Sequence, residues 1–85
     1  MIEYIQLKIV TREAKIFDAK VESITCVNEK GKFDILPYHI QFISLLDQNI
    51  NFVDEYGQHR SIVLTNGILR VIRNTVSIYG EVRNI

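Results

Sequence analysis

The chain has 85 residues, of which 47% are hydrophobic and 24% charged, and its ten basic residues balance ten acidic ones. This length and composition are typical of one small globular domain, which we place at residues 1–85. Balanced charge argues against the basic surface that binds nucleic acid or anionic lipid, and the apolar runs are too short to cross a bilayer. The N-terminus lacks the layout of a secretory signal, so we expect a cytosolic protein.

Apolar residues recur at every second position near the N-terminus, at Ile5, Leu7 and Ile9. This period predicts a half-buried strand. A second run, from Ile16 to Val27, is rich in β-branched residues. Its Asp18-Ala19-Lys20 stretch is expected to mark a bulge or break between two shorter strands, and the chain then turns at 28–31.

Turn residues divide the middle of the chain into short segments. Pro37 must end the strand that holds Phe33 and Ile35, because proline has no backbone N–H for a ladder hydrogen bond. An apolar block at 40–46 and a strand at 50–53 follow. Asp54-Glu55-Tyr56-Gly57 then reads as a hairpin turn in which glycine supplies a positive φ.

Three more strands are predicted at 60–65, 68–72 and 75–79, separated by Asn66-Gly67 and Arg73-Asn74. Asn-Gly is the strongest short signal for a hairpin turn. Short strands with turn residues between them predict an all-β domain. We expect an antiparallel β-sandwich or flattened barrel of about eight to ten short strands.

Side chains that could carry chemistry do not cluster in the sequence. The candidate metal ligands Cys26, His39 and His59 are scattered, so we expect no metal site and no catalytic residues. The four glycines are too far apart to cradle a phosphate, so we expect no cofactor. Cys26 lies in a strand-like run and is expected to be a buried structural thiol.

The four tyrosines and the nearby arginines allow two interpretations. They could stack and hold nucleic-acid bases, as in an oligonucleotide-binding barrel. Alternatively, the rings could be partly buried with their hydroxyls at the rim of the core. Balanced charge and the lack of a shared strand favour the second interpretation, and we expect no nucleic-acid partner.

Three segments resemble the epsilon subunit family of F-type ATP synthases, in the family's order and over nearly the whole chain. The first is LKIVTRE (7–13) followed by IFDAKVESIT (16–25). The second is KGKFDILPYH (30–39), with a glycine, an apolar pair before proline, and then histidine. The third is LTNGILRV (64–71), ending in TVSIY (75–79).

The resemblance implies a sandwich of roughly ten strands at the foot of the central stalk, on the cytoplasmic face of an energy-transducing membrane. Such a domain is a non-catalytic rotor part that packs against the gamma subunit and rests on the polar loops of the c-ring. The ring-facing residues implied by the resemblance are Gly31, Lys32, Pro37, Tyr38 and His39. The gamma-facing residues so implied are Thr11, Gln41, Phe42 and Ile43.

Three features depart from the family pattern. The usual subunit continues into two C-terminal helices that can brake ATP hydrolysis and, in some members, bind ATP. This chain stops at Ile85, either as a shortened piece or as a naturally short member of the family, and in both cases we expect a short form with neither hairpin inhibition nor nucleotide binding. Asp34 and Tyr38 replace common glycines, and Lys32 replaces a common acidic residue, so the ring loop opposite Lys32 is expected to be acidic or neutral. Residues 41–43 are bulkier than usual.

Fold alone does not determine function. A free-standing β-sandwich adaptor that binds some other protein is therefore the alternative to a rotor subunit. An enzyme or a nucleic-acid binder is a third class, but the sequence lacks the ligands, the nucleophile and the basic patch that these functions need.

Overall fold

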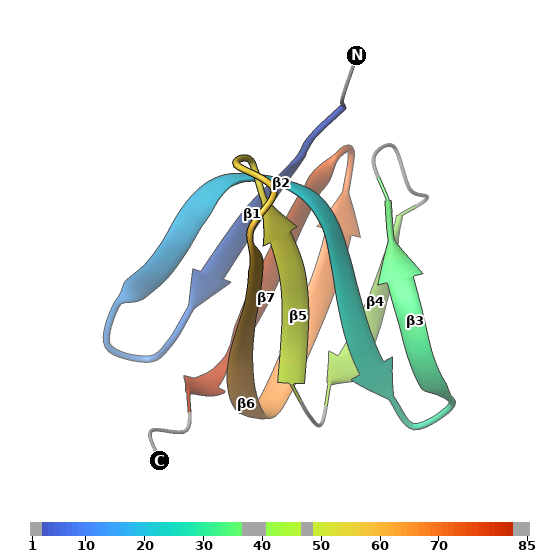
Figure 1. Cartoon of the computed structure of the whole chain (residues 1–85). Helices are drawn as coiled ribbons and strands as arrows, with labels where there is room; N and C mark the ends of the chain where they lie inside the picture. Colours follow the sequence, from blue (N-terminus) through green and yellow to red (C-terminus); the bar gives the residue numbers. More distant parts are fainter. Residues whose placement is uncertain (1–2, 37–40, 47–48, 83–85) are drawn as a thin grey trace.

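The computed structural model describes residues 3–36, 41–46 and 49–82, and this part of the chain forms seven strands without any helix, let alone one able to span a membrane (Figure 1). The predicted all-β class is confirmed. The strands are fewer than the expected eight to ten because two of them are 14 residues long. Their bounds are β1 (Ile5–Val10), β2 (Lys15–Asn28), β3 (Gly31–Ile35), β4 (Phe42–Leu46), β5 (Asn49–Asp54), β6 (His59–Ile72) and β7 (Thr75–Val82).

The two long strands join two layers. The first half of β2 pairs with β1, and its second half pairs with β5 and β3. In the same way, the first half of β6 pairs with β5 and its second half with β4. The first layer therefore holds β4, the end of β6, β7, β1 and the start of β2. The second layer holds β3, the end of β2, β5 and the start of β6.

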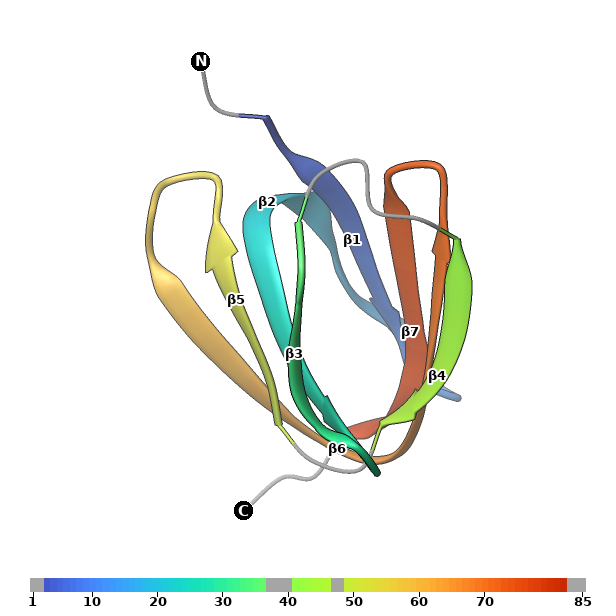
Figure 2. The same ribbon diagram turned by 90° about the vertical axis from the view of Figure 1, so that its right-hand side faces the viewer.

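The strand order β1-β7-β6-β5-β2 closes on itself because β1 also pairs with β2, so the sandwich is a flattened barrel. β3 and β4 are added to this ring, one in each layer, and face the viewer in Figure 2. The pairings are antiparallel except that of β1 with β7, which is parallel. This closure leaves edge strands only at β3 and β4 among the described strands.

Alternation along the strands explains the core. In β1, Ile5, Leu7 and Ile9 are buried while Gln6 and Lys8 are not, as the sequence predicts. The buried apolar residues of both layers form one cluster: Ile5, Leu7, Ile9, Val21, Ile24, Cys26, Ile35, Leu46, Ile50, Phe52, Leu64, Leu69, Val71, Val76 and Ile78.

Two of the predicted turns are confirmed. Gly57 has a φ of 80°, and its N–H donates to the Asp54 carbonyl at 3.0 Å. The Asp54 carboxylate also accepts from the backbone N–H groups of Tyr56 and Gln58, which fixes the β5–β6 hairpin. Between β6 and β7, Arg73 and Asn74 have φ values of 54° and 61°, as a two-residue hairpin loop of the mirror-image type requires.

The expected bulge or break at Asp18-Ala19-Lys20 is misplaced. These three residues pair in regular order with Lys8, Leu7 and Gln6 of β1. The irregularity lies just beyond them, between Val21 and Ser23, where β2 leaves β1 and begins to pair with β5. β2 therefore stays one strand that bends as it passes from the first layer to the second.

The prediction of a hairpin turn at Asn66-Gly67 is wrong. Both residues lie inside β6, where the register with β7 shifts between Thr65 and Ile68 and Asn66 has a φ of 55°. The pair forms a bulge at the bend where β6 changes layers. β7 follows β6 through this bend, so no chain reversal occurs.

Candidate protein-binding surface

The outer face of the first layer carries apolar side chains in a line across its strands. Leu45 of β4 is paired with Ile68 of β6, Ile68 with Tyr79 of β7, and Tyr79 with Val10 of β1. β2 bulges as it passes Val10, and Ile16 lies there, exposed like Asp18 two residues later on the same strand. We call Leu45, Ile68, Tyr79, Val10 and Ile16 the apolar row.

Exposure distinguishes this row from ordinary surface residues. Leu45 is 71% exposed and its neighbour Ile43 is 70% exposed, while Ile16, Ile68 and Tyr79 each expose over two fifths of their surface. Single exposed apolar residues are common, but a contiguous line of them marks a surface that another molecule covers. The row therefore has the chemistry of the core of a protein–protein interface.

Charged residues flank the apolar row on both sides. On one side, Arg12 and Glu81 form an exposed ion pair at 3.8 Å. On the other side, Arg70, Ser77 and Lys8 lie side by side on β6, β7 and β1. An apolar centre with a polar border is the usual plan of a non-obligate interface.

Asp18, which is paired with Lys8 across β1 and β2, already has partners within the chain. The Asp18 carboxylate accepts from Lys15 Nζ at 3.1 Å and from Gln6 Nε2 at 2.6 Å. The hydrogen bond from Lys15, followed by that from Gln6, lowers the pKa of Asp18, and the nearby charge of Lys8 acts in the same direction. Asp18 therefore stays ionised and held at neutral pH.

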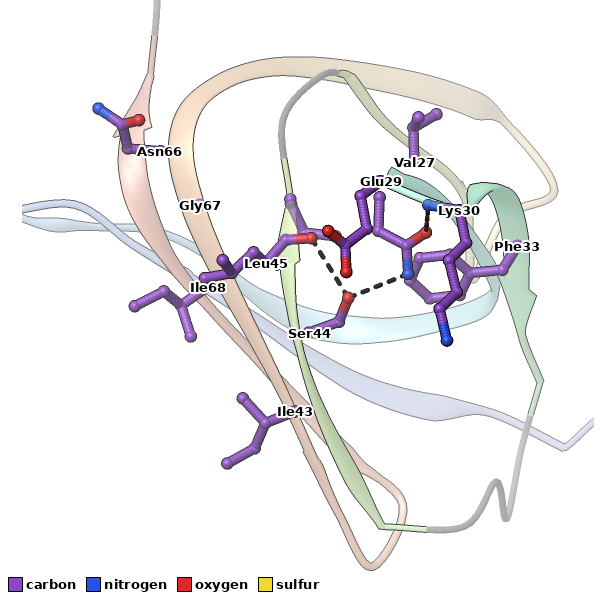
Figure 3. Close-up of a pocket in the computed structure, with 12 residues that line it drawn as sticks. Val27, Glu29, Lys30, Phe33, Ile43, Ser44, Leu45, Asn66, Gly67 and Ile68 are labelled. Atoms are coloured by element: carbon purple, nitrogen blue, oxygen red, sulfur yellow. Dashed lines mark hydrogen bonds between the residues drawn. The ribbon is translucent and has the colours of Figure 1, made fainter.

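A cleft of about 820 Å³ lies where β4 approaches the end of β2 and β3. Asn28 Nδ2 donates to Ser44 Oγ across it at 3.2 Å. In Figure 3, Ser44 is turned toward Phe33, whereas Ile43 and Ile68 lie on the opposite side of β4. The alternation of β4 thus turns Ser44 toward Asn28 and turns Ile43 and Leu45 to the other side of the strand, while all three residues contribute to the lining of the cleft.

The outer face of the second layer carries small polar residues at its centre. Thr25, Asn51 and Ser61 lie side by side on β2, β5 and β6, and Thr25 Oγ1 donates to Asp34 Oδ1 at 2.7 Å. These small side chains suit contact with water. The two faces of the sandwich therefore differ, and the apolar row belongs to only one of them.

Groups of three or more metal-ligating side chains are absent from residues 3–36, 41–46 and 49–82. Cys26 is buried in the core, as expected. Burial raises the pKa of its thiol to about 12, and the charge of Asp34 contributes to the shift. Because only the thiolate is a good nucleophile, Cys26 is suited to packing and not to catalysis.

We expect Cys26 to be unreactive in the folded protein. An aromatic disulfide reagent reacts with accessible protein thiols and releases a coloured thiolate that can be measured. At pH 8 it should detect essentially no thiol in the folded chain and one thiol per chain in guanidinium chloride. The unfolded sample serves as the control for reagent and protein concentration. Stoichiometric labelling of the native chain within minutes would contradict this assignment.

Two of the residues implied to face gamma, Thr11 and Ile43, lie at two edges of the outer face of the first layer. Thr11 follows Val10 directly, and Ile43 lies two residues before Leu45 on β4. Gln41 is exposed just before β4, and Phe42 belongs to β4, where it pairs with Val71. Thr11 and Ile43 thus lie near opposite ends of the apolar row.

Of the residues implied to face the ring, Gly31 and Lys32 begin β3 and are exposed. Gly31 has a φ of 116°, which favours glycine in this turn. Pro37, Tyr38 and His39 lie outside the described residues.

The chain matches, over residues 4–82, the model of the family described as ATP synthase, Delta/Epsilon chain, beta-sandwich domain. It belongs to this family. The resemblance seen in the three sequence segments is thereby confirmed, and so is the β-sandwich fold. The family is that of a subunit of ATP synthase.

Curated ATP synthase epsilon chains are similar to this chain. That of Nitratiruptor sp. is 35% identical over 78 residues, which are 91% of this chain and 60% of the relative. That of Clostridium botulinum is 30% identical over 76 residues, which are 88% of this chain and 57% of the relative. The chain therefore spans less than two thirds of the length of these epsilon chains.

Two solved ATP synthase structures contain a chain with the same fold. One from Euglena gracilis, a mitochondrial OSCP/F1/c-ring structure, matches with a TM-score of 0.87 and 21% identity over 94% of this chain and 52% of that one. One from Tetrahymena thermophila, a mitochondrial central stalk/c-ring structure, matches with a TM-score of 0.72 and 16% identity over 93% and 63%. At these identities the likeness concerns the fold.

Proposed function

We propose that this epsilon-family chain is a non-catalytic central-stalk subunit of an F-type ATP synthase, coupling the c-ring to the gamma shaft for ion-driven ATP synthesis. The observation that carries the proposal is the apolar row, an exposed line across one face of the family's β-sandwich. A rotor part has to stay attached while torque passes through it, and an apolar interface of several strands' width supplies such an attachment.

In this proposal, gamma covers the outer face of the first layer. Thr11 and Ile43 lie at two of its edges, next to the apolar row. Gly31 and Lys32, exposed at the start of β3, contact the polar loops of the c-ring together with Pro37, Tyr38 and His39. The chain is then held at the cytoplasmic face of the membrane through the complex, and not by insertion into the lipid.

Recovery of the partners from native membranes tests the proposal. The tagged chain, incubated with a detergent extract of its source membranes, should retain gamma together with the alpha, beta and c subunits, identified by mass spectrometry. Folded bait that recovers no ATP synthase subunit would overturn the proposal. In that case the hypothesis of a free-standing adaptor domain would be favoured, and the proteins retained by the bait would identify its partner.

A further inference from the structure

A shallow hollow of about 280 Å³ opens on the same face as the apolar row. Arg70, Ile72, Arg73, Thr75 and Ser77 line it, from the end of β6, the turn after it and β7. The polar side chains in this set are two guanidinium groups and two hydroxyls, and all four can donate hydrogen bonds. The hollow is therefore built to receive a hydrogen-bond acceptor.

The charge around the hollow is positive and unbalanced. Among the described residues, the ion pairs are Arg12–Glu81 and Lys15–Asp18, so Arg70 and Arg73 have no acidic partner there. Lys8 adds a third cation opposite Ser77 on β1. Its acidic neighbour, Asp18, already binds Lys15 and Gln6. An anionic acceptor would thus complement the site.

We propose that the hollow receives a carboxylate side chain of the protein that covers the apolar row. Under the proposed function, on which this inference rests, that protein is gamma. An aspartate or glutamate of gamma would accept hydrogen bonds from Arg70 and Arg73, since guanidinium groups match the planar carboxylate in a two-pronged geometry. The hydroxyls of Thr75 and Ser77 can supply further donors.

The short distance between the hollow and the apolar row favours one partner that contacts both. Arg70 is paired across the strands with Ile43 and lies two residues after Ile68, which is about 7 Å along an extended strand. One partner element that places an apolar side chain on Leu45 and Ile68 can therefore set an acidic side chain into the hollow. The apolar row next to the arginines favours a protein over a phosphate-bearing lipid surface, because it has the composition of an interface core.

Binding to purified gamma at two salt concentrations tests the inference. The wild-type chain should bind gamma more weakly in about 300 mM NaCl than in about 50 mM, because the higher salt shortens the electrostatic screening length by roughly twofold. This loss is expected of an interface that contains a charged contact. Arg70→Glu/Arg73→Glu should bind at least about tenfold more weakly at the lower salt. Its affinity should not fall at the higher salt, because salt screens the repulsion between its glutamates and the carboxylate of gamma. Arg70→Lys/Arg73→Lys should keep the salt dependence of wild type but only part of its affinity, because lysine retains the charge without the two-pronged geometry. Lys30→Glu, in the β2–β3 turn, should bind like wild type.

The possible outcomes separate this inference from the proposed function. If wild type binds gamma and the double glutamate variant, folded by circular dichroism, binds equally well, the inference is wrong and the proposed function stands. If wild type does not bind gamma, both fall. Vesicles containing phosphatidylglycerol are the second probe: arginine-dependent binding to these vesicles, with binding to gamma unaffected by the variant, would reassign the hollow to a lipid headgroup.

Discussion

Leu45→Asp/Tyr79→Asp is expected to weaken binding to gamma by at least about 100-fold, which corresponds to roughly 3 kcal/mol. Both side chains belong to the apolar row, and each is expected to contribute about 1.5 to 3 kcal/mol when fully covered by a partner. A carboxylate in the same place must also lose its water on binding. Isothermal titration with purified gamma measures the change directly.

A matched control is Tyr56→Asp/Ser61→Asp, which makes the same change in charge away from the row. Tyr56 is 82% exposed at the tip of the β5–β6 hairpin, and Ser61 lies on the polar face of the second layer. This variant should bind gamma like wild type. Equal binding by the Leu45→Asp/Tyr79→Asp variant, with its thermal unfolding unchanged, would show that gamma docks elsewhere.

The apolar row corresponds to a pattern in the sequence that cannot be interpreted without the pairing of the strands. Strict alternation predicts one apolar residue followed by one polar residue. Pairs of apolar neighbours break it at several places, and in five of these pairs one member lies in the row while the other is buried in the core or packs against it. Other apolar neighbours have no member in the row, such as Phe52-Val53 in the other layer and Val71-Ile72 in the first. The pairs become informative only when the register sets them side by side: Ile9-Val10, Ile16-Phe17, Leu45-Leu46, Ile68-Leu69 and Ile78-Tyr79.

Local chemistry allowed much of the fold to be predicted. The alternation of Ile5, Leu7 and Ile9 locates β1 and its buried face, and the turn residues around Gly57 and at Arg73-Asn74 locate two hairpins. These features depend on a few neighbouring residues. The family resemblance added the identity of the domain, which alternation and turns by themselves do not contain.

The two errors share one physical cause. A long strand that bends between layers resembles two strands with a turn between them, because a bulge and a turn both need residues that tolerate unusual backbone angles. Asn66-Gly67 satisfies either structure. What decides between them is the neighbouring strand: β7 runs past the bend and pairs on both sides of it, at Thr65 and at Ile68. That pairing belongs to the tertiary structure and cannot be inferred from the residues at the bend.

The contact between the two strands at this bend makes Gly80→Ala the most disruptive small substitution that we expect. A Cβ at Gly80 would lie 3.0 Å from the Cα of Gly67 and 3.5 Å from the carbonyl oxygen of Thr65. These are backbone atoms of β6, which cannot turn away as a side chain can. Forcing the strands apart should cost about 1 to 3 kcal/mol of unfolding free energy, measured by urea denaturation.

Glu81→Ala is the control for this substitution because it removes a side chain from the next position of β7 and fills no space. Glu81 loses only its exposed ion pair with Arg12, so stability should change by less than about 1 kcal/mol. If Gly80→Ala were as stable as Glu81→Ala, β6 and β7 would not need their close approach at the bulge. The bend would then depend on Asn66 alone, whose positive φ is the other special feature of this site.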